Sequence, residues 1–273
     1  MDVGESANVG DIADPKHDDD CYFCNAKDDP GNETNDLTDN FEEDGDLDGS
    51  LQDVKFKNDS GKLGSACGGD PGKRTVTVEG TKDGATLQVS TAAHHLIPGN
   101  ASLKESTLFQ CKKYLHKDEA APGNIGYNVN SAPNGVWLPG NYAARPWGTK
   151  GVDFQKKYGP TPRKYAYAAI NVWKAQFHDA HEEYSSFVKD VLNKLHDKLK
   201  LAEDLTCPEA KKKKDRPPEE RAPLYVLVAR MDTVSSRMRR MLVAPSTNWK
   251  KNIWTSSHSQ GYMSDASTAH VDA

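Results

Sequence analysis

The chain has no long apolar run, and little of it is hydrophobic. Apolar residues make up 36% of the 273 residues, and the mean hydropathy is −0.78. No stretch approaches the ~20 apolar residues of a membrane span, so we expect no membrane-spanning segment. Residues 1–5 show neither the basic nor the apolar part of a secretory signal peptide, which predicts synthesis in the cytoplasm. A Gly-rich phosphate loop of the Walker or Rossmann kind is also missing.

Cysteine is scarce and odd in number. An odd count without a signal peptide argues against a disulfide framework. Cys21 and Cys24 have the spacing of half a structural zinc site, but no second pair of this spacing exists. A complete zinc site would need His17 or a distant cysteine, and the alternative is a loop pair that is oxidised after export. The other three cysteines are Cys67, Cys111 and Cys207.

Basic residues are rare at the start of the chain and abundant after it. Residues 1–60 hold 19 acidic and 4 basic side chains, a net charge of −15, whereas the remainder holds 21 acidic and 31 basic, a net of +10. The basic body is typical of a nucleic-acid-binding protein. The acidic head cannot bury enough apolar surface to fold alone. It is either a solvated tail or an intramolecular polyanion that covers the basic face.

His94 and His95 follow a strand-like run, residues 86–90, and precede a Pro-Gly turn. Side chains of neighbouring residues on a strand point to opposite faces. Two adjacent imidazoles can therefore take different tasks, one as a metal ligand and the other as a general base near pH 7.

Two further motifs follow. Residues 134–139, Asn-Gly-Val-Trp-Leu-Pro, predict a turn and a short apolar strand. Apolar residues from Trp173 to Leu199 recur every three or four positions, which predicts an amphipathic helix of about eight turns. His178 and His181 would lie on this helix, with His181 at the border of its buried stripe. Asp179, Glu182 and Glu183 would lie on its exposed face or orient the imidazoles.

The order Ala-His-His, Asn and His-x-x-His-x-x-Tyr over residues 70–190 resembles the AHH-type nucleases of the HNH/endonuclease VII superfamily. The resemblance implies an α+β fold with a ββα-metal core, a β-hairpin followed by a helix. His94 and His181 would bind the metal, His95 would be the general base, and Asn134 would orient His95 or its loop. Tyr184 would pack one turn after His181. His178 is a third candidate ligand, although its spacing to His181 is i,i+3 where several such enzymes have i,i+4.

The expected cofactor is one divalent ion. It would neutralise charge on the phosphate in the transition state and assist the leaving oxygen. Imidazole ligands favour Zn²⁺, Ni²⁺ or Mn²⁺ over an ion that prefers oxygen, such as Mg²⁺, and the sequence does not choose among these four.

The predicted function is metal-dependent endonuclease cleavage, of DNA rather than RNA. Domains of this family are often toxins that a secretion system delivers into rival bacteria, so the resemblance also implies export, a secretion-system carrier and an immunity protein. The alternatives are a non-catalytic nucleic-acid-binding protein with a structural zinc and a different hydrolase with the same metal cluster.

Four segments are predicted: the acidic head 1–60, the nuclease domain 61–205, a basic, Pro-rich linker 206–222 and a C-terminal extension 223–273 that packs on the core. Residues 224–228 are a strand candidate and a helix follows. Ser259 onward is expected to be disordered. Trp249 and Trp254 could stack on bases or anchor the extension. The candidate nucleic-acid-binding residues are Lys211, Lys212, Lys213, Arg237 and Arg240.

Overall fold

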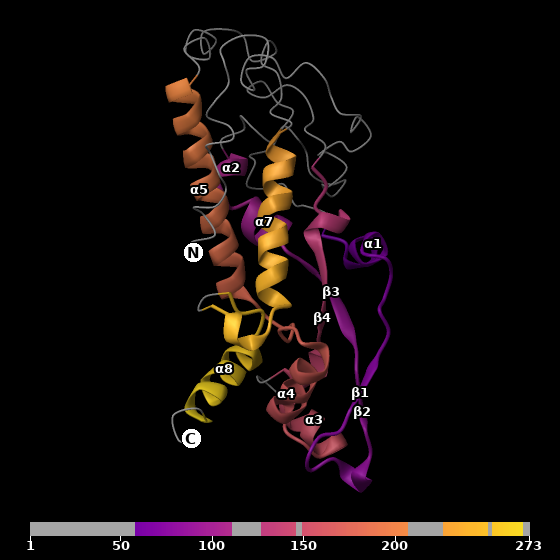
Figure 1. Ribbon diagram of the computed structural model, residues 1–273. Coiled ribbons are helices and arrows are strands. Elements are labelled where there is room, and N and C mark those ends of the chain that lie inside the picture. Colours follow the sequence, from indigo (N-terminus) through magenta and orange to yellow (C-terminus); the bar gives the residue numbers. More distant parts are fainter. Residues whose placement is uncertain (1–57, 111–126, 146–148, 207–225, 251–252, 270–273) are drawn as a thin grey trace. The chain divides into compact units, whose positions relative to one another are not determined.

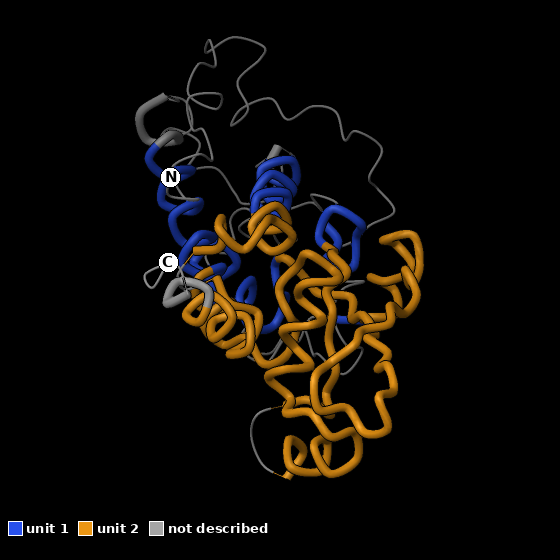
Figure 2. Tube along the Cα trace, turned by 60° about the horizontal axis from the view of Figure 1, so that its bottom comes forward, with its two compact units in different colours: residues 1–59, 97–134, 188–237 blue, residues 60–96, 135–187, 238–273 orange. Residues whose placement is uncertain are grey.

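The computed structural model describes residues 58–110, 127–145, 149–206, 226–250 and 253–269 (Figure 1). Helices and two small antiparallel sheets make this part an α+β fold, as the sequence predicted. The chain divides into two compact units (Figure 2): unit one holds residues 1–59, 97–134 and 188–237, and unit two the rest. Within the described helices, none is long and apolar enough to cross a membrane. The acidic head lies almost wholly outside the described residues, and the four predicted segments stay predictions.

Two pairs of strands build the sheets of unit two. After α1 (Ser60–Ala66), β1 (Arg74–Val76) pairs antiparallel with β2 (Leu87–Val89), and the turn η3 (Lys82–Gly84) lies between them. Then β3 (Thr91–His95) pairs antiparallel with β4 (Gly135–Pro139). The predicted strand at residues 135–139 is confirmed. A long segment rather than a tight turn separates β3 from β4, so this pair is not the simple hairpin that the resemblance implied.

The core of unit two lies between β1–β2 and the helices that follow β4. These are η6 (Tyr142–Ala144), α3 (Lys150–Tyr158) and α4 (Pro162–Trp173), followed later by η8 (Ser246–Asn248) and α8 (Ser257–Ala269). Trp249 and Trp254 are buried in this core, so they anchor the C-terminal segment. The prediction of disorder from Ser259 is wrong. Ser256 caps α8 by accepting a hydrogen bond from Ser259 N, and Ser259 is itself fully buried.

The predicted eight-turn helix from Trp173 is also wrong in its first part. α4 ends at Trp173, because Lys174 adopts a left-handed conformation with φ 56°. The next helix, α5 (Glu182–Thr206), begins only at Glu182. Between them the backbone bonds to other segments: Gln176 N donates to Leu242 O and Asp179 N to Thr255 O. Phe177 is buried as the periodicity suggested, but on an irregular segment between two helices.

Unit one is mainly helical. It contains η4 (Gly99–Leu103), α2 (Thr107–Gln110), η5 (Ala132–Asn134), the part of α5 from Val188 onward, and most of α7 (Val226–Leu242). The strand expected at residues 224–228 is wrong for residues 226–228, which begin α7, whereas residues 224 and 225 lie outside the described residues. A short apolar run alone does not distinguish a strand from a buried helix. The predicted helix that follows is confirmed. Its buried apolar residues are Leu227, Met231, Val234, Met238 and Leu242.

Candidate metal centre

The β3–β4 ladder fixes the two adjacent histidines. His94 pairs with Val136 and His95 with Gly135 at the end of the ladder. Strand alternation separates their environments, because His94 is only 2% exposed whereas His95 is partly exposed. One imidazole thus points into the unit and its neighbour remains accessible, which is the division that the sequence predicted for a ligand and a base.

The segment between α4 and α5 brings in two more histidines. His178 N donates to Pro139 O at 2.7 Å, and His178 forms a bridge with Gly140, just after β4. His181 immediately precedes α5: its carbonyl accepts from Ser185 N at 3.0 Å, and its Nδ1 lies 3.3 Å from Ser185 Oγ. Neither histidine lies within the helix, contrary to the prediction. An irregular segment anchored on β4 places them, so the i,i+3 spacing does not restrict how they meet.

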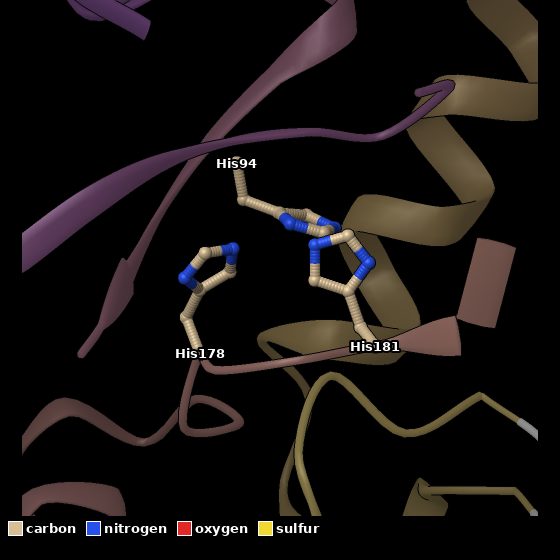
Figure 3. Close-up of side chains that lie close together, drawn as sticks. All are labelled: His94, His178 and His181. Atoms are coloured by element: carbon tan, nitrogen blue, oxygen red, sulfur yellow. The ribbon is translucent and has the colours of Figure 1, made fainter. Parts of the chain in front are cut away.

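The three histidines His94, His178 and His181 form a compact cluster (Figure 3). The ring centroid of His94 lies 5.0 Å from that of His178 and 4.9 Å from that of His181. One nitrogen from each ring lies within 4.8 Å of the other two, a set that could hold a metal ion. His94 Nε2 is buried and has no hydrogen-bond partner within the described residues. Buried polar atoms are rarely left unsatisfied, so this nitrogen fits a metal ligand.

The electrostatic environment keeps the cluster neutral. Burial lowers the pKa of His178 to about 3, and the charges of His181 and Arg145 act in the same direction. Burial likewise lowers the pKa of His94 well below its usual value, and it lowers the pKa of His181. Neutral imidazole is the form that binds metals, so the three rings are available as ligands at neutral pH.

Tyr184 forms one wall of the cluster. Its ring centroid lies 4.9 Å from that of His94, and its hydroxyl donates to Leu96 O at 2.7 Å. Tyr184 is fully buried on the first turn of α5. It therefore connects the start of α5 to the end of β3 and holds the ring of His94 in place.

A buried ion pair behind His178 was not predicted from the sequence. Arg145 Nε lies 2.7 Å from Asp179 Oδ1, and the Asp179 side chain is almost completely buried. Burial raises the pKa of Asp179, and the nearby Arg145 opposes that rise. The predicted exposure is thus wrong for Asp179, whereas Glu182 and Glu183 are exposed as expected. Arg145 does not belong to any of the sequence motifs, so the sequence did not indicate this ion pair.

Asn134 is fully buried at the end of η5. Its Nδ2 donates to Ile97 O at 3.0 Å and to Val129 O at 2.8 Å, and its Oδ1 accepts from Ile97 N at 2.7 Å. Ser235 Oγ donates to the same Oδ1 at 3.1 Å. Ile97 follows His95 by two residues, so Asn134 holds the backbone of the loop after the adjacent histidines.

A cleft of about 360 Å³ opens beside His181. One side is the start of α5 with Glu182 and Glu183, and the other is the start of α8 with Ser257 and Gln260. The cleft gives one of the clustered histidines access to solvent.

The predicted nucleic-acid-binding residues fall into two groups. Arg237 and Arg240 lie on α7, where Arg240 is exposed and Arg237 is partly buried. Lys211, Lys212 and Lys213 lie outside the described residues, as do Cys21 and Cys24. Their proposed roles stay predictions.

Comparisons with known proteins agree with the motifs. Residues 79–213 match the model of the AHH family, described as a nuclease family of the HNH/ENDO VII superfamily with conserved AHH. The matched range includes His94, His95, Asn134, His178 and His181. No curated protein and no solved structure matches the chain.

Proposed function

Because residues 79–213 belong to the AHH nuclease family of the HNH/ENDO VII superfamily, we propose that this protein is a metal-dependent endonuclease whose metal is held by His94, His178 and His181. The observation that carries the proposal is the buried, unpartnered Nε2 of His94 in a cluster of three neutral imidazoles. The donor set fits one divalent ion, with Zn²⁺, Ni²⁺ or Mn²⁺ favoured over Mg²⁺. When bound, the ion would supply Lewis-acid neutralisation of the phosphate charge.

His95 is the proposed general base. Its partly exposed imidazole is not one of the three clustered side chains, but besides burial its charge also lowers the pKa of His94, His178 and His181, which indicates that it lies near the cluster. A nitrogen of His95 accepts a proton from water, and the resulting hydroxide attacks the phosphorus of the phosphodiester. The bond from this phosphorus to one sugar oxygen breaks, and the leaving oxygen takes up a proton from a second water molecule. Asn134 acts as a positioning residue, since it fixes the backbone of Ile97 behind His95.

The proposal is tested by incubating the full chain with plasmid DNA and with total RNA, with and without EDTA. We expect cleavage that EDTA abolishes and a divalent ion restores, and faster cleavage of DNA than of RNA. The matched variants are His95→Ala, expected to be inactive, and His196→Ala on α5, expected to be active. His196 is a partly buried histidine remote from the cluster in sequence, paired with Asp197. Equal cleavage by both variants, with melting curves like that of the wild type, would refute the mechanism.

A non-catalytic protein with a structural zinc is the second candidate, because one buried and two partly buried imidazoles would also suit a structural ion. The two candidates differ at His95. A structural site predicts that removing the metal lowers the melting temperature while the metal-loaded protein cuts neither DNA nor RNA. A nuclease predicts that His95→Ala keeps the metal and the melting temperature but loses cleavage.

We also propose that the nuclease is an antibacterial effector with a cognate immunity protein, delivered by a secretion system. Family membership and the strongly basic body after residue 60 support this proposal. Induced expression of the full chain in bacteria should stop growth and degrade the chromosome, and His95→Ala should be tolerated. Growth without loss of viability or of chromosomal DNA would contradict the effector role.

A further inference from the structure

A second cleft in unit two, of about 270 Å³, contains none of the three clustered histidines. Its buried floor is made by Leu87, Phe154 and Tyr165, and its rim includes Gln88, Asn141 and Tyr158. This volume lies slightly below the ~300 Å³ at which pockets for drug-sized ligands begin. The cleft therefore suits one small planar ring system.

Three aromatic side chains, Phe154, Tyr158 and Tyr165, form one wall of the cleft. The ring centroid of Phe154 lies 4.8 Å from that of Tyr158 and 5.1 Å from that of Tyr165. Tyr158 is partly exposed, so one side of this aromatic group faces solvent at the rim. Apolar ring surfaces of this kind stack on bases irrespective of sequence, because every base has a π-face.

Polar groups fix one edge of the cleft. Tyr165 Oη donates to Gln88 O at 2.9 Å and accepts from Asn141 Nδ2 at 3.4 Å. Asn141 Oδ1 in turn accepts from Ala143 N at 2.9 Å. These bonds hold the rim residues in place before any ligand arrives. Amide and hydroxyl groups beside an aromatic wall match the polar edge and flat face of a nucleobase.

The helix that carries Phe154 and Tyr158, α3, also carries positive charge. Lys150, Lys156 and Lys157 are exposed on this helix, where Asp153 is the one acidic residue. Lys157 Nζ lies 5.0 Å from the centroid of the Tyr158 ring. A polyanion whose base entered the cleft would thus have its phosphates beside these lysines.

The cleft is linked to the histidine cluster through one short segment. Asn141 directly follows Gly140, whose backbone bridges to His178. Ser90 lies between β2 and β3, and its Oγ donates to Gly140 O at 3.0 Å. This hydrogen bond holds the segment of Gly140 and Asn141 against Ser90. One strand of nucleic acid could contact the cleft and reach the His178 side of the cluster.

We propose that this cleft binds an unpaired nucleobase of the nucleic acid, whose backbone lies over the α3 lysines. The inference rests on the proposed function for its ligand, and it adds that binding favours a single-stranded or unwound segment. It also adds the α3 lysines to the candidate nucleic-acid-binding residues that the sequence singled out, Lys211, Lys212, Lys213, Arg237 and Arg240.

The test measures binding without chemistry. The full chain is titrated in EDTA against fluorescent single-stranded oligonucleotides, dT and rU, and against a duplex of the same length. Tyr158→Ala should weaken single-strand binding about tenfold or more, the loss expected for one stacked base, and change duplex binding less than about twofold. Tyr158→Phe, which keeps the ring, should bind like the wild type. Lys157→Gln should weaken binding, whereas Lys174→Gln, the same charge change at the end of α4, should not.

Unchanged single-strand binding by a folded Tyr158→Ala would overturn the inference, and so would equal loss for single strand and duplex. If that variant does not fold, photocrosslinking of the wild type to a 5-iodouracil oligonucleotide decides. A crosslink within residues 86–88, at Asn141 or within residues 154–165 supports the cleft, and crosslinks only elsewhere overturn it. Binding that depends on Tyr158 without any cleavage would leave the cleft standing while the proposed nuclease function fails.

Discussion

Replacement of Asn134 by alanine should destabilise the protein more than almost any other polar substitution. The side chain is fully buried and takes part in four hydrogen bonds, two of them with the backbone of Ile97. Each buried group left without a partner costs about 1–3 kcal/mol. Relaxation around the new cavity recovers part of this cost. We expect a loss of about 3–5 kcal/mol in the free energy of unfolding, at the upper end for single substitutions.

Asn134→Asp is a second variant for this test, because aspartate has nearly the same shape as asparagine. It keeps one acceptor oxygen for Ile97 N, but its second oxygen faces the carbonyls of Ile97 and Val129. The buried carboxyl has to be protonated to donate, so its folded-state pKa should lie above its unfolded value of about 3.9. Because the pKa of this carboxyl is raised on folding, its protonation stabilises the folded state. This contribution to the free energy of unfolding is complete below the unfolded-state pKa and is lost as pH rises through the folded-state pKa. Asn134→Asp should therefore be less stable at pH 7 than at pH 5 relative to the wild type.

Urea denaturation of the metal-free protein, followed by circular dichroism, measures these differences. Asn193→Ala is the matched control, since Asn193 Oδ1 also accepts from a backbone N–H, that of Thr107, but at an exposed position. Water replaces that bond, so we expect a loss below about 1 kcal/mol. If Asn134→Ala unfolded at the same urea concentration as Asn193→Ala, the assigned network would not hold this loop.

Four further outcomes are expected. His95→Ala should lower the cleavage rate at least ~10²-fold and leave the metal content unchanged; full activity in a folded sample would contradict the base role. His181→Ala should lower metal affinity and activity together, as titration with a metal indicator would show, and unchanged affinity would remove it from the ligand set. The metal-free protein should lose stability as pH falls from about 6.5 toward about 3. In this range the imidazole of His178 binds a proton in the unfolded chain but not in the folded protein, where its pKa is lowered to about 3. His178→Gln should therefore flatten the dependence of the melting temperature on pH. Nucleic-acid affinity should fall at least tenfold between ~50 and ~200 mM salt. If residues 1–60 cover the basic face, their deletion should raise the affinity for nucleic acid at low salt only. Equal binding by the truncated and the full chain would assign the acidic head another role.

The local sequence was sufficient to predict that the two adjacent histidines on β3 differ in environment. Strand alternation separates adjacent side chains whatever the surrounding fold, and His94 is buried where His95 is partly exposed. Which of the two would be the ligand came from the family resemblance, and the strand after Asn134 was predicted from a turn followed by a short apolar run. The burial of Trp249 and Trp254 was one of two open alternatives, because an aromatic residue in a basic segment suits either a core or a base-stacking surface.

Only the tertiary structure decided where His178 and His181 lie. Their periodicity predicted one continuous helix, yet the backbone of His178 bonds to Pro139 and that of Asp179 to Thr255, which together end the helical pattern. Helix propensity is a weak prior that such long-range bonds override. The pairing of Arg145 with the buried Asp179 and the hydrogen bonds of Asn134 to Ile97 and Ser235 were equally unpredictable, since these partners are distant in sequence. The sequence by itself determined which side chains can do the chemistry, and the long-range hydrogen bonds decided how they meet.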